Sequence, residues 1–400
     1  MSYSRVIEQS DQMIRELVDA GERVLGYVYP HLPLEIIMAH GLTPSLVRTS
    51  PAVIGSYEDS LQTFACSLTR NLFSQRSTES LPPLAGIIFS GNTCDSLQNV
   101  GDVWRKRFPQ DNVFRLTYPV GDFGDASIQY LTEEFKRFSK DLEAVFASPF
   151  SNEEFKDAVS LVAEIRGGLQ FLYSARILAP QLLSYLQLAD LITEFFTAPT
   201  DAILEKVMKE KGEVMDKLES LDLFDKAIHL GEALLHQDLS GIEGPGDSST
   251  PRIAIAGGMV EPSTLASLFG ALPNFSDEII ALDLLTYGFK TIFTPPAPLE
   301  GDPFQNCAQT VLGAPKEPTQ EGLSRRLDFL KQILAKLSIS GLVICEQSFC
   351  DPDEFEAPSL ANAAEDVGVA SIRFPIDPEF SDRSRLEGRI QTFLETLGNS

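Results

Sequence analysis

Two stretches of this sequence share one plan: LAGIIFSGNTCD at residues 84–95 and SGLVICEQSFCD at residues 340–351. In each, a short apolar run leads into a polar turn, and the stretch ends in Cys-Asp. Apolar runs of this length are typical of parallel strands that are buried on both faces. In open α/β sheets, ligands bind beyond the carboxyl ends of such strands. The sequence therefore predicts a metal or cluster site built from two parts of the fold, around Cys94 and Cys350.

Strand and helix patterns alternate on both sides of a long helical stretch. We expect strands over residues 23–29, 84–89, 112–117, 252–256, 278–282, 340–345 and 369–375. Strands that alternate with helices predict doubly wound parallel sheets. Between the two groups, residues 128–236 have an almost entirely helical pattern. The expected fold is therefore α/β, with an N-terminal α/β domain (1–150), a helical connecting segment (151–250) and a C-terminal α/β domain (251–400).

Charge and hydropathy narrow the class of protein. The net charge of −25 argues against a nucleic-acid or anionic-membrane partner, which would need clustered Lys and Arg. No apolar run approaches the roughly 18 residues of a membrane span, and the N-terminal stretch lacks the apolar core of a signal peptide. We therefore expect a cytoplasmic protein that binds neither nucleic acid nor membrane and keeps its thiols reduced.

The five cysteines differ in how well their surroundings suit a metal. Cys94 precedes an expected helix, whose positive N-terminal end favours the thiolate form. Cys350 has the same setting and is followed by Asp-Pro. Cys345 lies inside an expected strand and is more readily interpreted as core, and Cys307 has no ligand-like neighbour. Cys66 lies on a helix expected over residues 60–72, away from its apolar face, and by itself gives a weak signal.

The remaining motifs do not indicate a particular function. The four histidines follow no zinc-binding pattern. His31 and His40 flank a helix expected over residues 33–40, where they would line a cleft or lie on the surface. The Ala-Gly-Gly at residues 256–258 is similar to the start of a phosphate-binding turn but lacks the third glycine. No ATP-binding motif is present.

A series of short motifs along the chain points to a family. They are PLE (33–35), AHG (39–41), FAC (64–66), NTCDS (92–96), DVW (102–104), FCDP (349–352) and GRIQTFLE (388–395). In this order and spacing, the chain resembles the 2-hydroxyacyl-CoA dehydratases. That family includes 2-hydroxyglutaryl-CoA dehydratase component D and the related benzoyl-CoA reductase subunits.

The resemblance implies a cofactor and its ligands. Carried over position by position, Cys66, Cys94 and Cys350 would hold a [4Fe-4S] cluster in the cleft between the two α/β domains. Three thiolates would leave one iron open for the thioester carbonyl or a solvent ligand. Glu35 matches a position that is often acidic in the family, and would act in proton transfer near the cluster or be an ordinary glutamate on a helix surface.

The resemblance also implies a reaction and partners. The chain would be one subunit of an enzyme that eliminates water from a 2-hydroxyacyl-CoA through a ketyl radical, after one-electron reduction. Its partners would be a homologous second subunit and a separate ATP-dependent iron–sulfur activator. The alternatives are a subunit of a benzoyl-CoA-reductase-type enzyme, a partner subunit that does not bind substrate, and a zinc-stabilised binding protein that uses the same cysteines.

Overall fold

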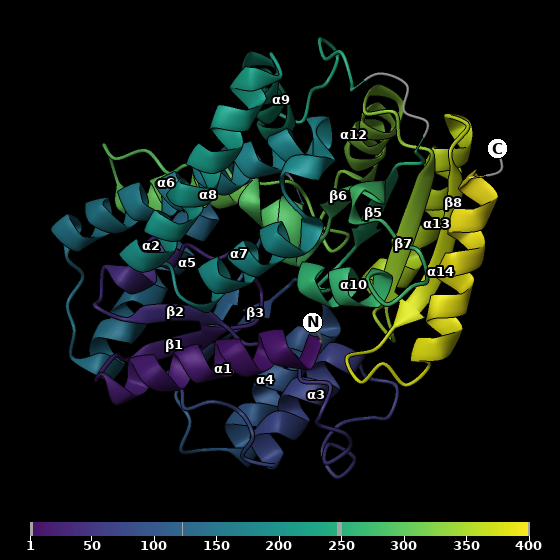
Figure 1. The fold of residues 1–400 in the computed structure, drawn as a ribbon. Coiled ribbons are helices and arrows are strands. Elements are labelled where there is room, and N and C mark those ends of the chain that lie inside the picture. The colour runs from purple at the N-terminus through teal and green to yellow at the C-terminus, as the bar shows by residue number, and fades with distance from the viewer. Residues whose placement is uncertain (1–2, 122, 246–249, 399–400) are drawn as a thin grey trace.

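The computed structural model describes residues 3–121, 123–245 and 250–398. These residues form two four-stranded sheets in which all neighbouring strands are parallel. The strand orders are β2-β1-β3-β4 and β6-β5-β7-β8, and Figure 1 shows helices packed around both sheets. The α/β class with two parallel sheets is therefore confirmed.

The elements have the following bounds. The strands are β1 (Val24–Tyr27), β2 (Thr43–Leu46), β3 (Gly86–Gly91), β4 (Val113–Thr117), β5 (Ile253–Gly257), β6 (Ile280–Leu284), β7 (Gly341–Gln347) and β8 (Ala370–Ile376). The α-helices are α1 (Tyr3–Asp19), α2 (Leu34–Met38), α3 (Ser67–Ser77), α4 (Asp95–Arg107), α5 (Asp125–Phe146), α6 (Asn152–Leu178), α7 (Tyr185–Thr197), α8 (Asp201–Ser220), α9 (Phe224–Leu235), α10 (Pro262–Phe269), α11 (Pro303–Gly313), α12 (Leu323–Lys336), α13 (Asp351–Asp366) and α14 (Arg383–Gly398). Shorter helical turns are η1 (Pro180–Leu182), η2 (Asp277–Ile279) and η3 (Thr286–Lys290).

The two stretches quoted first form inner strands of the two sheets. Every residue of β3 and of β7 is buried, as expected for strands covered on both faces. Both strands extend two residues further toward the carboxyl end than the sequence predicted, so their polar turns are shorter. The pattern missed β2, which contains Pro44. This strand pairs with β1 at the edge of its sheet, where a proline is tolerated because one side of the strand needs no ladder hydrogen bonds.

The helix predicted over residues 60–72 was placed too early in the chain. Cys66 has non-helical backbone angles (φ −47°, ψ 133°), and α3 begins after it at Ser67. Phe64, in the loop before α3, is 64% exposed, whereas Leu68 and Leu72 on α3 are buried. The apolar spacing of the loop residues matched a helix by coincidence, so Cys66 precedes the helix and does not lie on one of its faces.

Buried polar groups attach the helical middle of the chain to the second sheet. Arg176 in α6 is fully buried, and its guanidinium donates to the backbone carbonyl of Ile280 at 2.7 Å. Asp283 in β6 accepts hydrogen bonds from the hydroxyls of Tyr173 (2.8 Å) and Tyr185 (3.1 Å), which lie on α6 and α7. One hydrophobic core also contains residues from all three parts of the chain. The domain boundaries at residues 150 and 250 stay predictions.

None of the described helices is long and apolar enough to cross a lipid bilayer.

Candidate cluster site

Cys66, Cys94 and Cys350 each stand immediately before a helix. They are the N-cap residues of α3, α4 and α13, and the last two follow the turns after β3 and β7. All three line one cavity of about 620 Å³, called here the cysteine cavity. The structure therefore brings together the three cysteines that the family resemblance selected, from both halves of the chain.

Hydrogen bonds around Cys66 join it to the segments that carry the other two cysteines. The backbone N–H of Cys66 donates to Oγ of Ser96, at the start of α4, at 3.4 Å. The next N–H, of Ser67, donates to the carbonyl of Ser348 at 3.0 Å. The side chain of Gln347 in β7 donates to Oγ of Ser67 at 2.5 Å. These bonds join the start of α3 to the start of α4 within the first half of the chain, and to the segment before α13 in the second half.

The three thiols are in different protonation environments. A hydrogen bond donated by the Cys350 thiol lowers the pKa of Cys66, and the same bond, with burial, raises the pKa of Cys350. Burial raises the pKa of Cys94 to about 12, although the backbone N–H of Leu97 donates to its Sγ at 3.4 Å. The sequence had suggested that the helix N-terminus favours a thiolate at Cys94. In the structure, burial outweighs that effect. A metal must displace its proton, so metal binding depends on pH.

The other two cysteines lie elsewhere. Cys345 is fully buried in β7, as expected for a core residue, and Cys307 is buried in α11. In the described parts of the chain, no three His, Cys, Asp or Glu side chains lie close enough together to hold one metal ion. The three cysteine thiols therefore share a cavity but do not meet at a single point.

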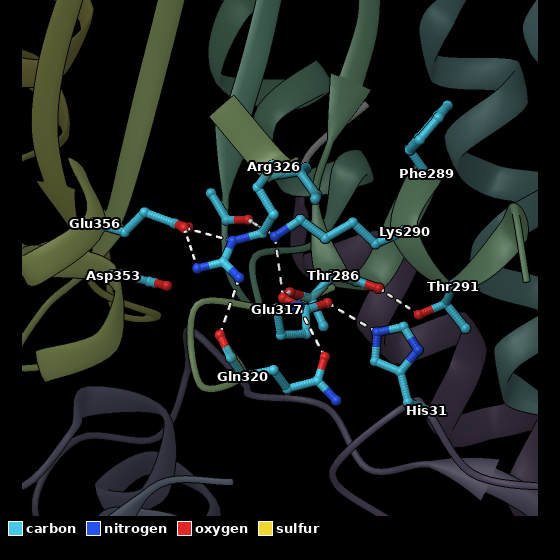
Figure 2. Close-up of polar contacts among 12 residues, drawn as sticks. His31, Thr286, Phe289, Lys290, Thr291, Glu317, Gln320, Arg326, Asp353 and Glu356 are labelled. Atoms are coloured by element: carbon cyan, nitrogen blue, oxygen red, sulfur yellow. Dashed lines mark hydrogen bonds and ion pairs between the residues drawn. The ribbon is translucent and has the colours of Figure 1, made fainter. Parts of the chain in front are cut away.

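A buried carboxylate holds the loop at residues 314–322, which forms one wall of the cysteine cavity. Glu317 has a side chain only 3% exposed, and Figure 2 shows three donors around it. Its carboxylate accepts from Nε2 of His31 (2.9 Å), from Oγ1 of Thr286 (2.9 Å) and from Nζ of Lys290 (3.0 Å). His31 follows β1, whereas Thr286 and Lys290 follow β6. One side chain therefore links the carboxyl-terminal edges of both sheets.

Two further contacts fix the same loop. The backbone N–H of Glu321 donates to the carbonyl of Val120, in the N-terminal half, at 3.1 Å. Arg326 on α12 donates to the carbonyl of Gln320 at 2.9 Å and, through Nε, to Oε1 of Glu356 on α13 at 2.6 Å. Four loop residues reach the cavity wall: Pro318, Gln320, Glu321 and Gly322.

The Ala-Gly-Gly turn after β5 packs against a carboxyl group. A Cβ at Gly258 would lie 2.4 Å from Oδ1 of Asp353, so only glycine fits this close approach. Asp353 is in the first turn of α13, and its Oδ2 accepts from the backbone N–H of Gln347 at 3.2 Å. Burial raises the pKa of Asp353 to about 7. A side chain of the protein therefore occupies the position where a phosphate group was considered.

Glu35 and the two histidines are buried, which rules out the surface positions considered for them. Glu35 does not line the cysteine cavity. It lines a separate small cavity with Arg166 and Cys307, and its Oε1 lies 3.7 Å from Nη1 of Arg166. Burial raises the pKa of Glu35. Nε2 of His40 lies 2.8 Å from the hydroxyl of Ser139.

Sequence reasoning missed Glu317, Asp353 and Tyr29, which all line a smaller cavity next to Cys94 and Cys350. Glu317 lies in a loop rich in Pro and Gly, a pattern that usually indicates exposed chain. Its partners are separated from it by 286, 31 and 27 positions in the sequence. No local sequence pattern indicates contacts at such different separations. The sequence gives a hint only for Asp353, which is an acidic residue three positions after Cys350, in the first turn of an expected helix.

We expect the Glu317→Gln variant to lose about 3–5 kcal/mol of unfolding free energy at pH 7, because Lys290 would remain buried without its counter-charge. Burial alone would raise the pKa of Glu317, but Lys290 and His31 outweigh it and lower the pKa to about 2 from 4.5. The stabilising contribution is therefore complete above about pH 4.5 and is lost as the pH falls toward 2.

Chemical denaturation of both proteins between pH 7 and pH 3 measures this difference, which should shrink as the pH falls. Glu321→Gln is the matched control, because Glu321 is an exposed residue of the same loop. It should change stability by about 0.5 kcal/mol or less. A Glu317→Gln variant as stable as the control would contradict a structural role for this carboxylate.

Comparison with known proteins identifies similar chains. The chain is 23% identical to the beta subunit of lactoyl-CoA dehydratase from Anaerotignum propionicum, over 95% of this chain and 93% of that protein. It is 20% identical to the (R)-phenyllactyl-CoA dehydratase beta subunit of Clostridium sporogenes, over 99% and 97% of the two chains. It is also 20% identical to a benzoyl-CoA reductase subunit of Thauera aromatica, over 95% and 92%.

The family model for 2-hydroxyglutaryl-CoA dehydratase, D-component, matches residues 30–397, which is nearly the whole chain. The resemblance noted in the sequence is confirmed, and the chain belongs to this family.

Proposed function

We propose that this chain is one subunit of an iron–sulfur 2-hydroxyacyl-CoA dehydratase, with Cys66, Cys94 and Cys350 as the ligands of a [4Fe-4S] cluster. The observation that carries the proposal is that three thiols from three helix N-termini, in both halves of the chain, line one cavity. Family membership over residues 30–397 supports the reaction class.

The side chains around the cysteine cavity fit such a group. Thiolate sulfur is the usual protein ligand of iron–sulfur clusters, and three thiols leave one iron without a protein ligand. The backbone N–H of Leu97 already points to Sγ of Cys94 and would stabilise its thiolate. When bound, the cluster would supply one electron to the thioester carbonyl, which promotes loss of the α-hydroxyl and acidifies the β position.

The chain's own residues would position the cluster and limit access to it. The bonds of Ser67 to Ser348 and to Gln347 keep the walls of the cavity together. Arg326, paired with Glu356, lines the same cavity and holds the loop beside it. With its walls fixed in this way, the site would hold the thioester in one orientation and restrict the entry of water.

The names of the relatives suggest which partners this chain would have. The dehydratase relatives are named as beta subunits, which supports a homologous second subunit for this chain. A separate ATP-dependent iron–sulfur activator would deliver the electron.

The similarity to a benzoyl-CoA reductase subunit favours a second candidate function, a component of an acyl-CoA reductase with the same architecture. Supplying the reconstituted complex with a 2-hydroxyacyl-CoA or an aryl-CoA distinguishes the two.

We expect anaerobically purified protein to contain about four iron atoms per chain. Replacing Cys66, Cys94 or Cys350 with Ala should remove most of this iron, because each change deletes a ligand. Cys345→Ala is the matched control, since Cys345 is a buried cysteine outside the cavity, and it should keep the iron. Zinc in place of iron, or full iron in the Cys94→Ala variant, would contradict the proposal.

A catalytic role for Glu35 stays a prediction. Burial raises the pKa of its carboxyl, which is the direction that a proton donor requires, but Glu35 lies outside the cysteine cavity. If Glu35 transfers a proton, Glu35→Gln should lower turnover about 100-fold or more while iron content stays unchanged. Unchanged turnover would exclude this role, and reduced turnover together with iron loss would indicate a structural role beside Arg166.

A further inference from the structure

A second, smaller cavity lies behind the cysteines. It has a volume of about 30 Å³ and is called here the inner cavity. Its walls include Cys94, Cys350 and Glu317, and also Tyr29 and Thr319. At roughly 10–15 Å³ per water molecule, it has room for only about two or three waters or for the edge of a larger group. It therefore shares Cys94 and Cys350 with the cysteine cavity and also borders the buried carboxylate of Glu317.

Two hydroxyl groups in the wall of the inner cavity have no partner beyond each other. Within the described part of the chain, the hydroxyls of Tyr29 and Thr319 are hydrogen-bond neighbours, and neither makes a hydrogen bond of good geometry with any other group. Both oxygen atoms are buried, and the Tyr29 residue is only 5% exposed. If one hydroxyl donates to the other, the second donor of the pair has no acceptor, which costs about 1–3 kcal/mol when the group is buried. The pair therefore indicates a missing acceptor.

The nearest carboxylate has little capacity left for these hydroxyls. Glu317 already accepts from His31, Thr286 and Lys290. The orientation of the Tyr29 ring is fixed by edge contact with Tyr118, at 5.2 Å between ring centroids, and by the His31 ring at 5.4 Å. The hydroxyl of Tyr29 is therefore held in place beside that of Thr319, with no other protein group as its partner in the described residues.

Tyr29 carries a hydrogen-bond donor. A phenol has an ordinary pKa of about 10, so its hydroxyl is protonated at neutral pH and can donate a hydrogen bond. Cys94 and Cys350 line the same small cavity, so an acceptor held by these cysteines would lie beside the hydroxyl.

We propose that the hydroxyls of Tyr29 and Thr319 donate hydrogen bonds to sulfur atoms of the group held by Cys94 and Cys350, and so help to set its reduction potential. This inference rests on the proposed function. A donor hydrogen bond to sulfur stabilises the more negative, reduced state, and hydrogen bonds to the sulfurs are among the factors that determine cluster potentials. Tyr29 and Thr319 are then positioning residues that act through the cofactor.

The test is the midpoint potential of the anaerobically isolated full-length chain, followed by the electron paramagnetic resonance of its reduced state. Tyr29→Phe and Thr319→Val each delete one hydroxyl and keep the side-chain shape. Both variants should keep their iron and show a more negative midpoint potential. Tyr118→Phe is the matched control, because its hydroxyl already donates to the backbone carbonyl of His31 at 3.0 Å, and it should leave the potential unchanged.

The outcomes separate the two proposals. Wild-type protein without an iron–sulfur signal would overturn the proposed function, and this inference with it. Wild-type protein with the signal, and potentials in Tyr29→Phe and Thr319→Val equal to that of the wild type at full iron content, would overturn this inference alone. Should one variant fail to fold, the other decides the result.

Discussion

The buried carboxylate of Glu317 is the contact on which the arrangement of the site depends. Burying a charge is strongly unfavourable unless it is paired and hydrogen-bonded. Glu317 meets this condition with donors from both halves of the chain, His31 from the first and Thr286 and Lys290 from the second. Because these donors follow β1 and β6, the carboxylate is satisfied only when the carboxyl-terminal edges of the two sheets face each other. The loop that carries Glu317 is then fixed as a wall of the cysteine cavity.

The topology explains why the cysteines meet there. In a parallel sheet, successive strands end at one edge, and the helices that follow begin at that edge. Cys94 and Cys350 come after the inner strands β3 and β7 and immediately before α4 and α13. Cys66 reaches the same place from a loop that is bonded to the turn after β7. Each thiol is thus placed by the start of a regular helix, a rigid support for a ligand.

Local pattern predicted much of this fold. The inner strands β3 and β7 are continuous apolar runs, and a helix was expected directly after Cys94, where α4 begins. The pattern failed for β2, where Pro44 masks an edge strand, and for α3, where apolar spacing in a loop imitated a helix. In both cases, contacts with distant segments outweigh the local preference.

The candidate site was only partly readable from sequence. The settings of Cys94 and Cys350 could be recognised from strand, turn and helix start, whereas Cys66 was selected only through family resemblance. Glu317 and Tyr29 could not be found in this way. Their importance comes from burial and from partners far along the chain, and neither has a distinctive local sequence.

The central claim is that Cys66, Cys94 and Cys350 hold one iron–sulfur cluster, and crystallography of the anaerobically isolated protein tests it most directly. Anomalous diffraction measured on both sides of the iron absorption edge would locate the iron atoms. The account predicts a single iron cluster in the cysteine cavity, bonded to Sγ of all three cysteines. Iron at another position, or a disulfide between Cys66 and Cys350 with no iron beside it, would contradict it.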